Sequence, residues 1–174
     1  MRATLFLLTT LFTSSALAET RHADAHVHGV NHAQIILSGS TLQITYEFPA
    51  GQLNENDEHK HDEHKHDEHI GHLKEINGIE AVVAIPTAAE CVQTKINHTL
   101  RAVASTGTDD EHAGHQDAII EATLDCQTPS ALKSLDFSPA FNRFDDVEKI
   151  EVEGIVGSQS LSETVSAKKA VISF

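Results

Sequence analysis

The sequence predicts a mainly β fold: an antiparallel, sandwich-like domain with one or two short helices and a disordered arm rich in His, Asp and Glu. Two observations support this prediction. Apolar and polar residues alternate over several short segments, and a period of two is typical of half-buried strands. Turn residues separate these segments, and helical periodicity is confined to short stretches. An α+β fold is the alternative.

The N-terminus has the three parts of a secretory signal peptide. Arg2 precedes an apolar run that starts at Leu5, and Ala16-Leu17-Ala18 has the small residues of a cleavage site. The apolar run is too short to span a membrane. We therefore expect residues 1–18 to be removed and residues 19–174 to form a single exported domain, with no membrane insertion after cleavage.

The composition is acidic and rich in histidine. The formal net charge is −14 with neutral histidines, and loss of Arg2 with the signal peptide makes it −15. A chain with this charge is repelled by nucleic acid and by anionic membrane surfaces, and it attracts cations. The 13 histidines, against one Tyr and no Trp, bias the composition towards metal ligands.

The first predicted strands form a hairpin. Residues 33–37 and 42–48 flank the turn Ser38-Gly39-Ser40. In the second strand, side chains of one parity are expected to face the core: Leu42, Ile44, Tyr46 and Phe48. Tyr46 is expected to be a core residue with its hydroxyl at the edge, without a catalytic role.

Residues 91–103 and 118–124 form a second predicted hairpin, and the two cysteines flank its open end. Cys91 and Cys126 predict one disulfide in an exported protein, which leaves no thiolate for a metal. Pairing them sets Leu124 opposite Gln93, so the apolar faces disagree by one residue and a β-bulge or an asymmetric loop is required. The face expected inside comprises Val92, Ile96, Leu100 and Ala102, with His98 as a satisfied core residue.

The remaining chain predicts short elements. Ile70, Leu73 and Ile76 are spaced by three and predict a short helix. Residues 79–85 form a strand or a buried turn, and residues 129–135 include a helical turn. The last strands are expected at 147–155, 161–165 and 170–174, after a core plug of Phe137, Phe141 and Phe144.

Residues 57–72 form a repeat of five residues, DEHKH, that decays at its end. It contains six histidines and six carboxylates, and it has too little apolar surface to offset its ordering entropy. We therefore expect a disordered insert at about residues 54–69. A metal-binding arm is favoured over a charged solubilising loop or a pH sensor. Its candidate ligands are His59, His61, His64, His66, His69 and His72.

A second cluster, HADAHVHGVNH, spans residues 22–32. In an extended strand its even positions, including His32, lie on one side, and neighbouring imidazoles of a His-x-His pair are about 6.5–7 Å apart. Gly29 permits a bulge or a tight bend. The candidate ligands are His22, Asp24, His26 and His28. A frayed terminus without fixed geometry is the alternative.

A third cluster lies in the predicted loop 105–115, with His112 and His115 beside three acidic residues. Two histidines from one strand and a third from a neighbouring element make a zinc site with one open position. That position suits water in a zinc hydrolase or lyase, or entry and exit of the ion. No general base or hydrolase motif is identifiable, so we expect no enzyme.

The order of these motifs resembles the ZrgA-type family of zinc-regulated, zinc-binding periplasmic proteins of Gram-negative bacteria. The resemblance rests on a few features in order: His26-Val27-His28-Gly29, the apolar hairpin ending at Pro49, the His-rich insert, Ala89-Glu90-Cys91, His112, Cys126 and the Phe-rich last third. It implies a periplasmic location, an association with a high-affinity zinc ABC importer, and His26, His28 and His112 as core ligands.

The sequence thus predicts a periplasmic zinc-binding protein that captures, buffers or passes Zn²⁺ towards a high-affinity importer. We expect a monomer that binds several zinc ions, with a zinc ABC-importer binding protein as a partner. A Ni²⁺ or Cu²⁺ binding protein is one alternative, because histidine-rich sites take both ions well. A zinc-dependent hydrolase or lyase is the alternative from another class.

Overall fold

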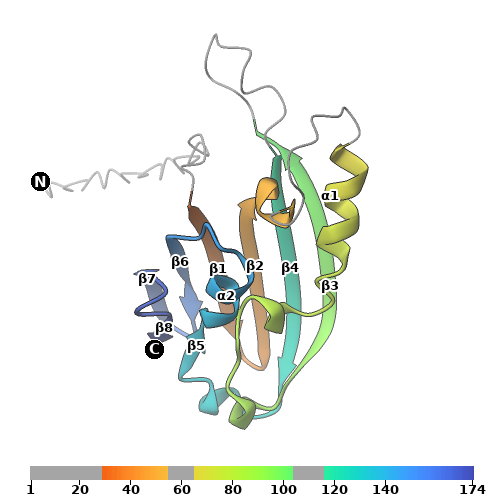
Figure 1. The fold of residues 1–174 in the computed structure, drawn as a ribbon. Helices are drawn as coiled ribbons and strands as arrows, with labels where there is room; N and C mark the ends of the chain where they lie inside the picture. Colours follow the sequence, from red (N-terminus) through yellow and green to blue (C-terminus); the bar gives the residue numbers. More distant parts are fainter. Residues whose placement is uncertain (1–28, 55–64, 104–115) are drawn as a thin grey trace, which may run out of the picture.

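The computed structural model describes residues 29–54, 65–103 and 116–174. Its main element is a six-stranded sheet with strand order β3-β4-β2-β1-β6-β7 (Figure 1). The strands are β1 (Val30–Ser38), β2 (Thr41–Pro49), β3 (Cys91–Ala102), β4 (Gln116–Cys126), β6 (Lys149–Val156) and β7 (Gln159–Val165). Neighbours are antiparallel except β1 and β6, which are parallel. The predicted mainly β fold is confirmed. The sequence predicts antiparallel strands, so the parallel pairing of β1 with β6 is a feature that it does not predict.

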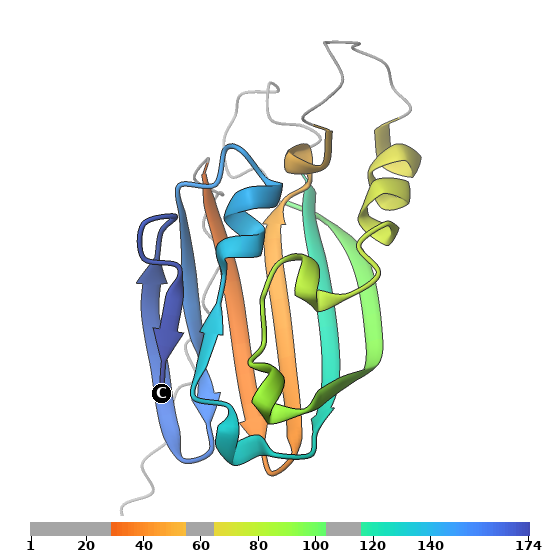
Figure 2. The same ribbon diagram turned by 60° about the horizontal axis from the view of Figure 1, so that its bottom comes forward.

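Short elements form a second layer over one face of this sheet (Figure 2). They include a two-stranded sheet of β5 (Ser134–Asp136) and β8 (Val171–Ser173), helix α2 (Ser138–Arg143), and the 3-10 turns η1 (Ala50–Asn54), η2 (Ile79–Ala81), η3 (Thr87–Ala89) and η5 (Pro129–Ala131). A backbone bridge between Ala84 and Asp136 ties this layer together. The layered arrangement agrees with a sandwich-like domain, although the second layer has few strands.

The core lies between the two layers, as the alternation in β2 predicts. Leu42, Ile44, Tyr46 and Phe48 are buried, whereas Gln43 on the other face is exposed. The ring of Phe48 lies 4.7 Å from that of Phe144, centroid to centroid. The expected aromatic plug is confirmed, with Phe137 and Phe144 buried and Phe141 half-buried.

The first hairpin is confirmed with a two-residue turn. Ser38 pairs with Thr41, so Gly39 and Ser40 occupy the turn. Gly39 has a φ of 62°, the left-handed conformation that hairpin turns require and that glycine adopts without steric cost. The turn therefore sets the register that brings the apolar residues of β1 and β2 to the same face.

The second hairpin contains both predicted features, the disulfide and the bulge. Cys91 and Cys126 are bonded and directly paired in the β3–β4 ladder, whose register shifts between Gln93 and Lys95. The shift also changes the face on which side chains lie. Ile96 packs against the core as expected, whereas Val92, before the bulge, is 60% exposed. The prediction that Val92 faces inward is therefore wrong, because the bulge separates it from Ile96.

Helix α1 (Lys65–Lys74) lies against η1 and β3. It begins inside the insert that the sequence predicts to be disordered, because its apolar side anchors it: Leu73 and the following Ile76 are buried, and Ile70 is half-buried. His98 of β3 lies with one ring nitrogen, Nε2, 2.8 Å from the carbonyl oxygen of Ile76, so the predicted structural histidine is confirmed. None of the described helices is long and apolar enough to cross a membrane.

Candidate metal centre

The described residues that border the three histidine-rich segments lie at one end of the sheet, drawn at the top of Figure 1. We call it the upper end: the starts of β1, β4 and β6 and the ends of β2 and β3. Strand pairing establishes this arrangement, since Ala102 of β3 pairs with Gln116 of β4, and Pro49 of β2 pairs with Asp117. Val30 of β1 pairs with Lys149 of β6 at the same end.

Most of the predicted ligands lie outside the described residues, namely His22, Asp24, His26, His28, His59, His61, His64, His112 and His115. The backbone of α1 carries His66, His69 and His72. His72 is half-buried, and its Nδ1 lies 3.7 Å from Oε2 of Glu75. Within residues 29–54, 65–103 and 116–174, no group of three or more His, Cys, Asp or Glu side chains could hold a metal ion.

The chain is attached to the sheet from Gly29 onward. Gly29 has a φ of 80°, a conformation that glycine adopts without steric cost. Its carbonyl oxygen accepts hydrogen bonds from the backbone N–H groups of Glu148 and Lys149, at 2.9 and 3.1 Å. These bonds fix the residue that directly follows His28.

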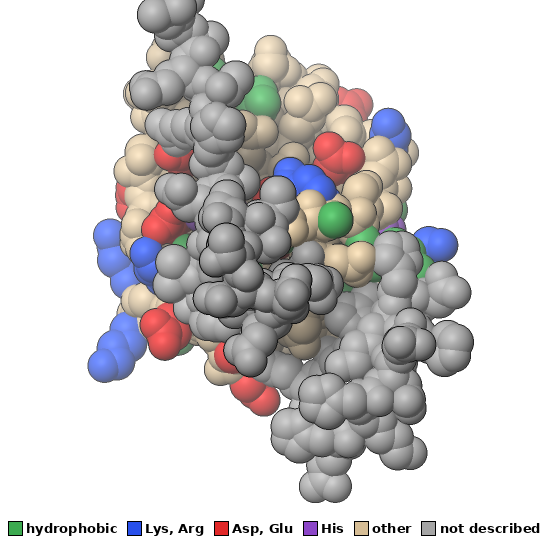
Figure 3. Space-filling model, turned by 90° about the horizontal axis from the view of Figure 1, so that it is seen from above, with side chains coloured by type: hydrophobic (Ala, Val, Ile, Leu, Met, Phe, Trp, Pro, Cys, Tyr) green, Lys and Arg blue, Asp and Glu red, His purple; other side chains and the backbone are tan. Residues whose placement is uncertain are grey.

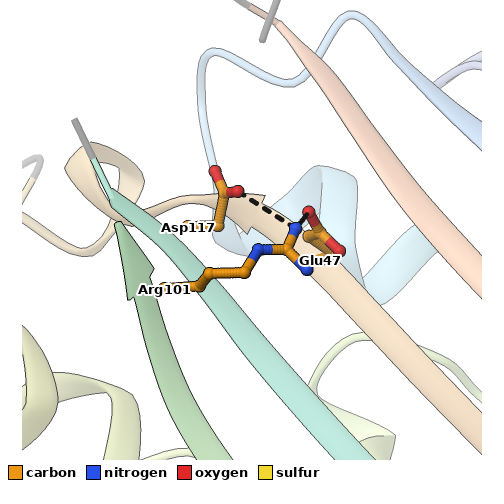
Figure 4. A network of polar contacts seen from close by, with 3 residues as sticks. All are labelled: Glu47, Arg101 and Asp117. Carbon is orange, nitrogen blue, oxygen red and sulfur yellow. Dashed lines mark hydrogen bonds and ion pairs between the residues drawn. The ribbon is translucent and has the colours of Figure 1, made fainter. Parts of the chain in front are cut away.

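An arginine connects three strands at the upper end (Figure 4). The guanidinium of Arg101, on β3, contacts the carboxylate of Glu47 on β2 and lies 3.3 Å from Oδ2 of Asp117 on β4. Asp117 is buried, with 1% of its surface exposed, so this charge depends on the arginine for compensation. The network holds together the strand ends that lead into and out of residues 104–115.

A second polar contact joins β1 to β6 on the uncovered face. His32 pairs in register with Glu47 of β2 on one side and Glu151 of β6 on the other. Nδ1 of His32 lies 3.7 Å from Oε2 of Glu151, while Nζ of Lys149 donates a 2.7 Å hydrogen bond to Oε1 of Glu151. This hydrogen bond from Lys149 lowers the pKa of Glu151.

A buried amide network supports the upper end from the covered face. The side-chain nitrogen of Asn31 donates to the hydroxyl of Tyr46 at 2.8 Å and to Oε1 of Gln52 at 3.1 Å. Gln52 donates in return to Oδ1 of Asn31 at 3.1 Å. Tyr46 is a core residue as predicted, but its hydroxyl is buried, and this burial raises its pKa. The network attaches η1 to β1 and β2.

The surface of the upper end is mixed in charge. Figure 3 looks onto it from above, and acidic and basic side chains of the described residues are interspersed on it. This mixture agrees with the contacts of Arg101 and Lys149, each of which lies next to a carboxylate.

Sequence reasoning does not identify the polar residues of the sheet itself as part of a site. His32 belongs to the N-terminal alternation, but Arg101 and Glu151 have no local signal that marks them. Their neighbours come from distant parts of the sequence, and only strand order brings them together.

These features define a class: a β-rich domain with histidine- and carboxylate-rich segments attached at one end of its sheet. The profile of the ZrgA family, described as zinc uptake proteins, matches residues 25–174. The chain therefore belongs to the ZrgA family, and the resemblance seen in its motifs is confirmed. No curated protein matches the sequence.

Proposed function

We propose that this protein binds Zn²⁺ in the periplasm and captures, buffers or passes it towards a high-affinity importer. The observation that carries the proposal is the attachment of three histidine-rich segments at one end of a single sheet, in a chain of a zinc uptake family. Imidazole and carboxylate are preferred ligands of Zn²⁺. A zinc ABC-importer binding protein is the partner that we propose.

The core site in this proposal consists of His26, His28 and His112, with His22, Asp24 and His115 as further donors. Short tethers support it. β2 separates β1 from β4, so at about 4.8 Å per strand Gly29 and Gln116 belong to strands about 10 Å apart. A tether of four residues, as between His112 and Gln116, can span about 13 Å. The two groups of histidines are therefore within reach of one ion.

In the same proposal, the histidine-rich insert binds additional zinc ions at lower affinity. His59, His61 and His64 precede α1, and its backbone carries His66, His69 and His72. The repeat presents histidines and carboxylates at high density, and the part that precedes α1, which the sequence predicts to be disordered, loses conformational entropy when it binds an ion. The sheet-anchored site has less to order, so its affinity is expected to be higher.

The test is a zinc titration of residues 19–174 by calorimetry with a competing chelator. The structure argues for substitution in place of deletion in the arm, because removing residues 57–72 would remove most of α1. One variant replaces His59, His61 and His64 with Gln, and another replaces His26 and His28 with Ala. His98→Gln serves as a matched control, since His98 is engaged with the Ile76 carbonyl.

The arm variant should lose weakly bound ions and keep the tight one, and the His26→Ala/His28→Ala variant should lose the tight one. Unchanged stoichiometry in both variants would reject the assignment. Affinity should fall as pH drops through about 6.5, where imidazoles become protonated. Parallel titrations with Ni²⁺ and Cu²⁺ test the alternative metals, and an esterase or hydratase assay of the zinc-loaded protein tests the enzyme alternative.

A further inference from the structure

The buried polar side chains of the described chain are gathered at the upper end. Among residues 29–54, 65–103 and 116–174, the buried polar or charged residues are Asn31, Gln52 and Asp117, with 0%, 4% and 1% of their surface exposed. Asn31 lies near the start of β1, Gln52 in η1 directly after β2, and Asp117 near the start of β4 (Figure 1). The other buried side chains of these residues are hydrophobic. The polar part of the core therefore coincides with the end at which the histidine-rich segments attach.

Each of these buried polar residues is also a sequence neighbour of one histidine-rich segment. Asn31 follows His28 by three residues, and Gln52 precedes residue 55 of the insert by three. Asp117 follows the segment 104–115 by two residues. Three residues span at most about 11 Å, so each buried polar group lies close to the point at which one segment joins the sheet.

Asn31 and Gln52 connect two of these attachment points directly. They exchange two hydrogen bonds of 3.1 Å, although they are 21 residues apart in sequence. Asn31 also donates a 2.8 Å hydrogen bond to the hydroxyl of Tyr46. Hydrogen bonds require a narrow range of distances and angles, whereas apolar contacts are non-directional. The network therefore specifies one position of η1 relative to the start of β1.

Stability alone does not call for this network. An amide that is buried gives up its hydrogen bonds to water, and the hydrogen bonds made inside the protein restore little more than that loss. Replacing both partners with apolar groups of similar shape is therefore nearly neutral for stability. Apolar replacements would not reproduce the direction of the bonds, so the network is best explained by the geometry that it imposes.

We propose that Asn31 and Gln52 are positioning residues for zinc binding: their hydrogen bonds hold η1 against the start of β1, so that two histidine-rich segments extend from adjacent, fixed points. This inference rests on the proposed function and extends it to residues that touch no ion. Ligands that extend from fixed points lose less conformational entropy when they gather around one ion, and their effective concentration is higher. The network thus raises the affinity for zinc without supplying a ligand.

A network that only satisfies polar groups of the core is the competing explanation. The two explanations differ in what happens when the polar groups are removed and the shape is kept. If the network only fills the core, a folded variant with apolar replacements binds zinc as the wild type does. If it positions the segments, the same variant binds zinc more weakly while the number of bound ions is unchanged.

The test compares a network variant with a matched core variant. The network variant, Asn31→Leu/Tyr46→Phe/Gln52→Leu, removes the polar groups of the network and keeps side chains of similar size. The control is Ile44→Val, because Ile44 is buried on the same face of β2 and is absent from the network. Zinc titrations of the mature proteins with a competing chelator measure affinity and stoichiometry, and urea denaturation measures the unfolding midpoint.

The network variant should keep the wild-type stoichiometry and bind its tightest zinc ion about 10-fold more weakly, with a urea midpoint no lower than that of Ile44→Val. Ile44→Val should have a lower midpoint than the wild type and an unchanged affinity. Wild-type affinity in the network variant, or equal losses of affinity in the two variants, would overturn the positioning role and leave the proposed function standing. A wild type that binds no zinc would overturn both.

A measurement on the wild type decides the result if the network variant does not fold. NMR follows the side-chain amide protons of Asn31 and Gln52 before and after addition of ZnCl₂. They should exchange slowly with water in the zinc-free protein, because the network forms before the ion arrives, and their resonances should shift when zinc binds. Fast exchange in the zinc-free protein, or resonances that do not respond to zinc, would overturn the positioning role.

Discussion

Along β2 the two faces of the sheet carry opposite kinds of side chain. Tyr46 and Phe48 point into the core between the layers and are fully buried, while Gln43 and Glu47 face the uncovered side. The covered face is held by packing, which depends on shape and is insensitive to charge. The uncovered face carries polar contacts across strands, such as Glu47 with Arg101, in which charge and accessibility matter.

This difference separates apolar packing from polar contacts in one sheet. Truncation of apolar side chains on the covered face should change the free energy of unfolding strongly. Substitutions of exposed side chains on the uncovered face, away from the buried Asp117 and its partner Arg101, should change it little. The following predictions test this division.

The largest effect is expected for Phe48→Ala. Phe48 is fully buried and stacks near Tyr46 and Phe144, so its truncation should lower the free energy of unfolding by about 3–5 kcal/mol. Gln43→Ala, on the exposed face of the same strand, should change it by less than about 0.5 kcal/mol. Urea denaturation measures both values. Similar losses in the two variants would show that the division between the faces is wrong.

The disulfide ranks next. Cys91 and Cys126 are 35 residues apart in sequence and cross-link the end of the β3–β4 hairpin opposite the upper end. Replacing both with Ser should lower the free energy of unfolding by about 3–4 kcal/mol, mainly by releasing a constraint on the unfolded chain. The zinc stoichiometry of the folded variant should not change. If the folded variant bound fewer zinc ions than the wild type, the two ends of the sheet would be coupled.

Gly154→Ala tests the close approach of β6 to β1. A Cβ atom at Gly154 would overlap the carbonyl oxygen of Ile35 and lie 2.8 Å from its carbonyl carbon. Backbone atoms in a ladder cannot move away easily, so we expect a loss of about 1–3 kcal/mol by urea denaturation. Gly51→Ala is the control, since a Cβ atom there would meet no heavy atom within 4 Å beyond its chain neighbours. If Gly154→Ala left the free energy of unfolding unchanged, β1 and β6 would tolerate more separation than their geometry implies.

The smallest effect concerns pH. A carboxyl whose folded pKa is lowered contributes stability that is complete above its unfolded pKa and is lost as pH falls through the folded value. Lys149 lowers the pKa of Glu151, so Lys149→Met should raise it towards the ordinary value near 4.3. Carboxyl NMR measures this pKa directly.

The accompanying change in stability should be below about 1 kcal/mol, because both side chains are exposed to solvent, and it should shrink as the pH falls below about 4. Lys168→Met, in the turn between β7 and β8, is the control and should leave the pKa of Glu151 unchanged. An equal pKa in wild type and Lys149→Met would contradict the assigned cause.

Sequence reasoning succeeds where a pattern is local or where two patterns conflict. The alternation in 42–48 predicts both the strand and its buried side. The bulge in β3 follows from a conflict: pairing the two cysteines sets the polar Gln93 opposite the apolar Leu124, so an extra residue is needed to bring the apolar faces of the two strands together. The structure has that irregularity between Gln93 and Lys95. The same bulge explains why the prediction for Val92 is wrong.

The polar contacts of the upper end lie beyond such reasoning. Arg101, Glu47 and Asp117 meet because β3, β4 and β2 are neighbours, and His32 meets Glu151 because β6 returns parallel to β1. The core ligands predicted from His26, His28 and His112 stay a prediction, since they lie outside the described residues.

The sequence by itself determined where the strands of the large sheet lie, that the two cysteines pair, and that histidine and carboxylate side chains are concentrated in three segments. These properties depend on local period and side-chain chemistry. Only the tertiary structure decided that β1 lies between β2 and β6, and that the three segments attach at one end of the sheet. A strand has the same alternation whichever partner it pairs with, so strand order is settled by long-range packing.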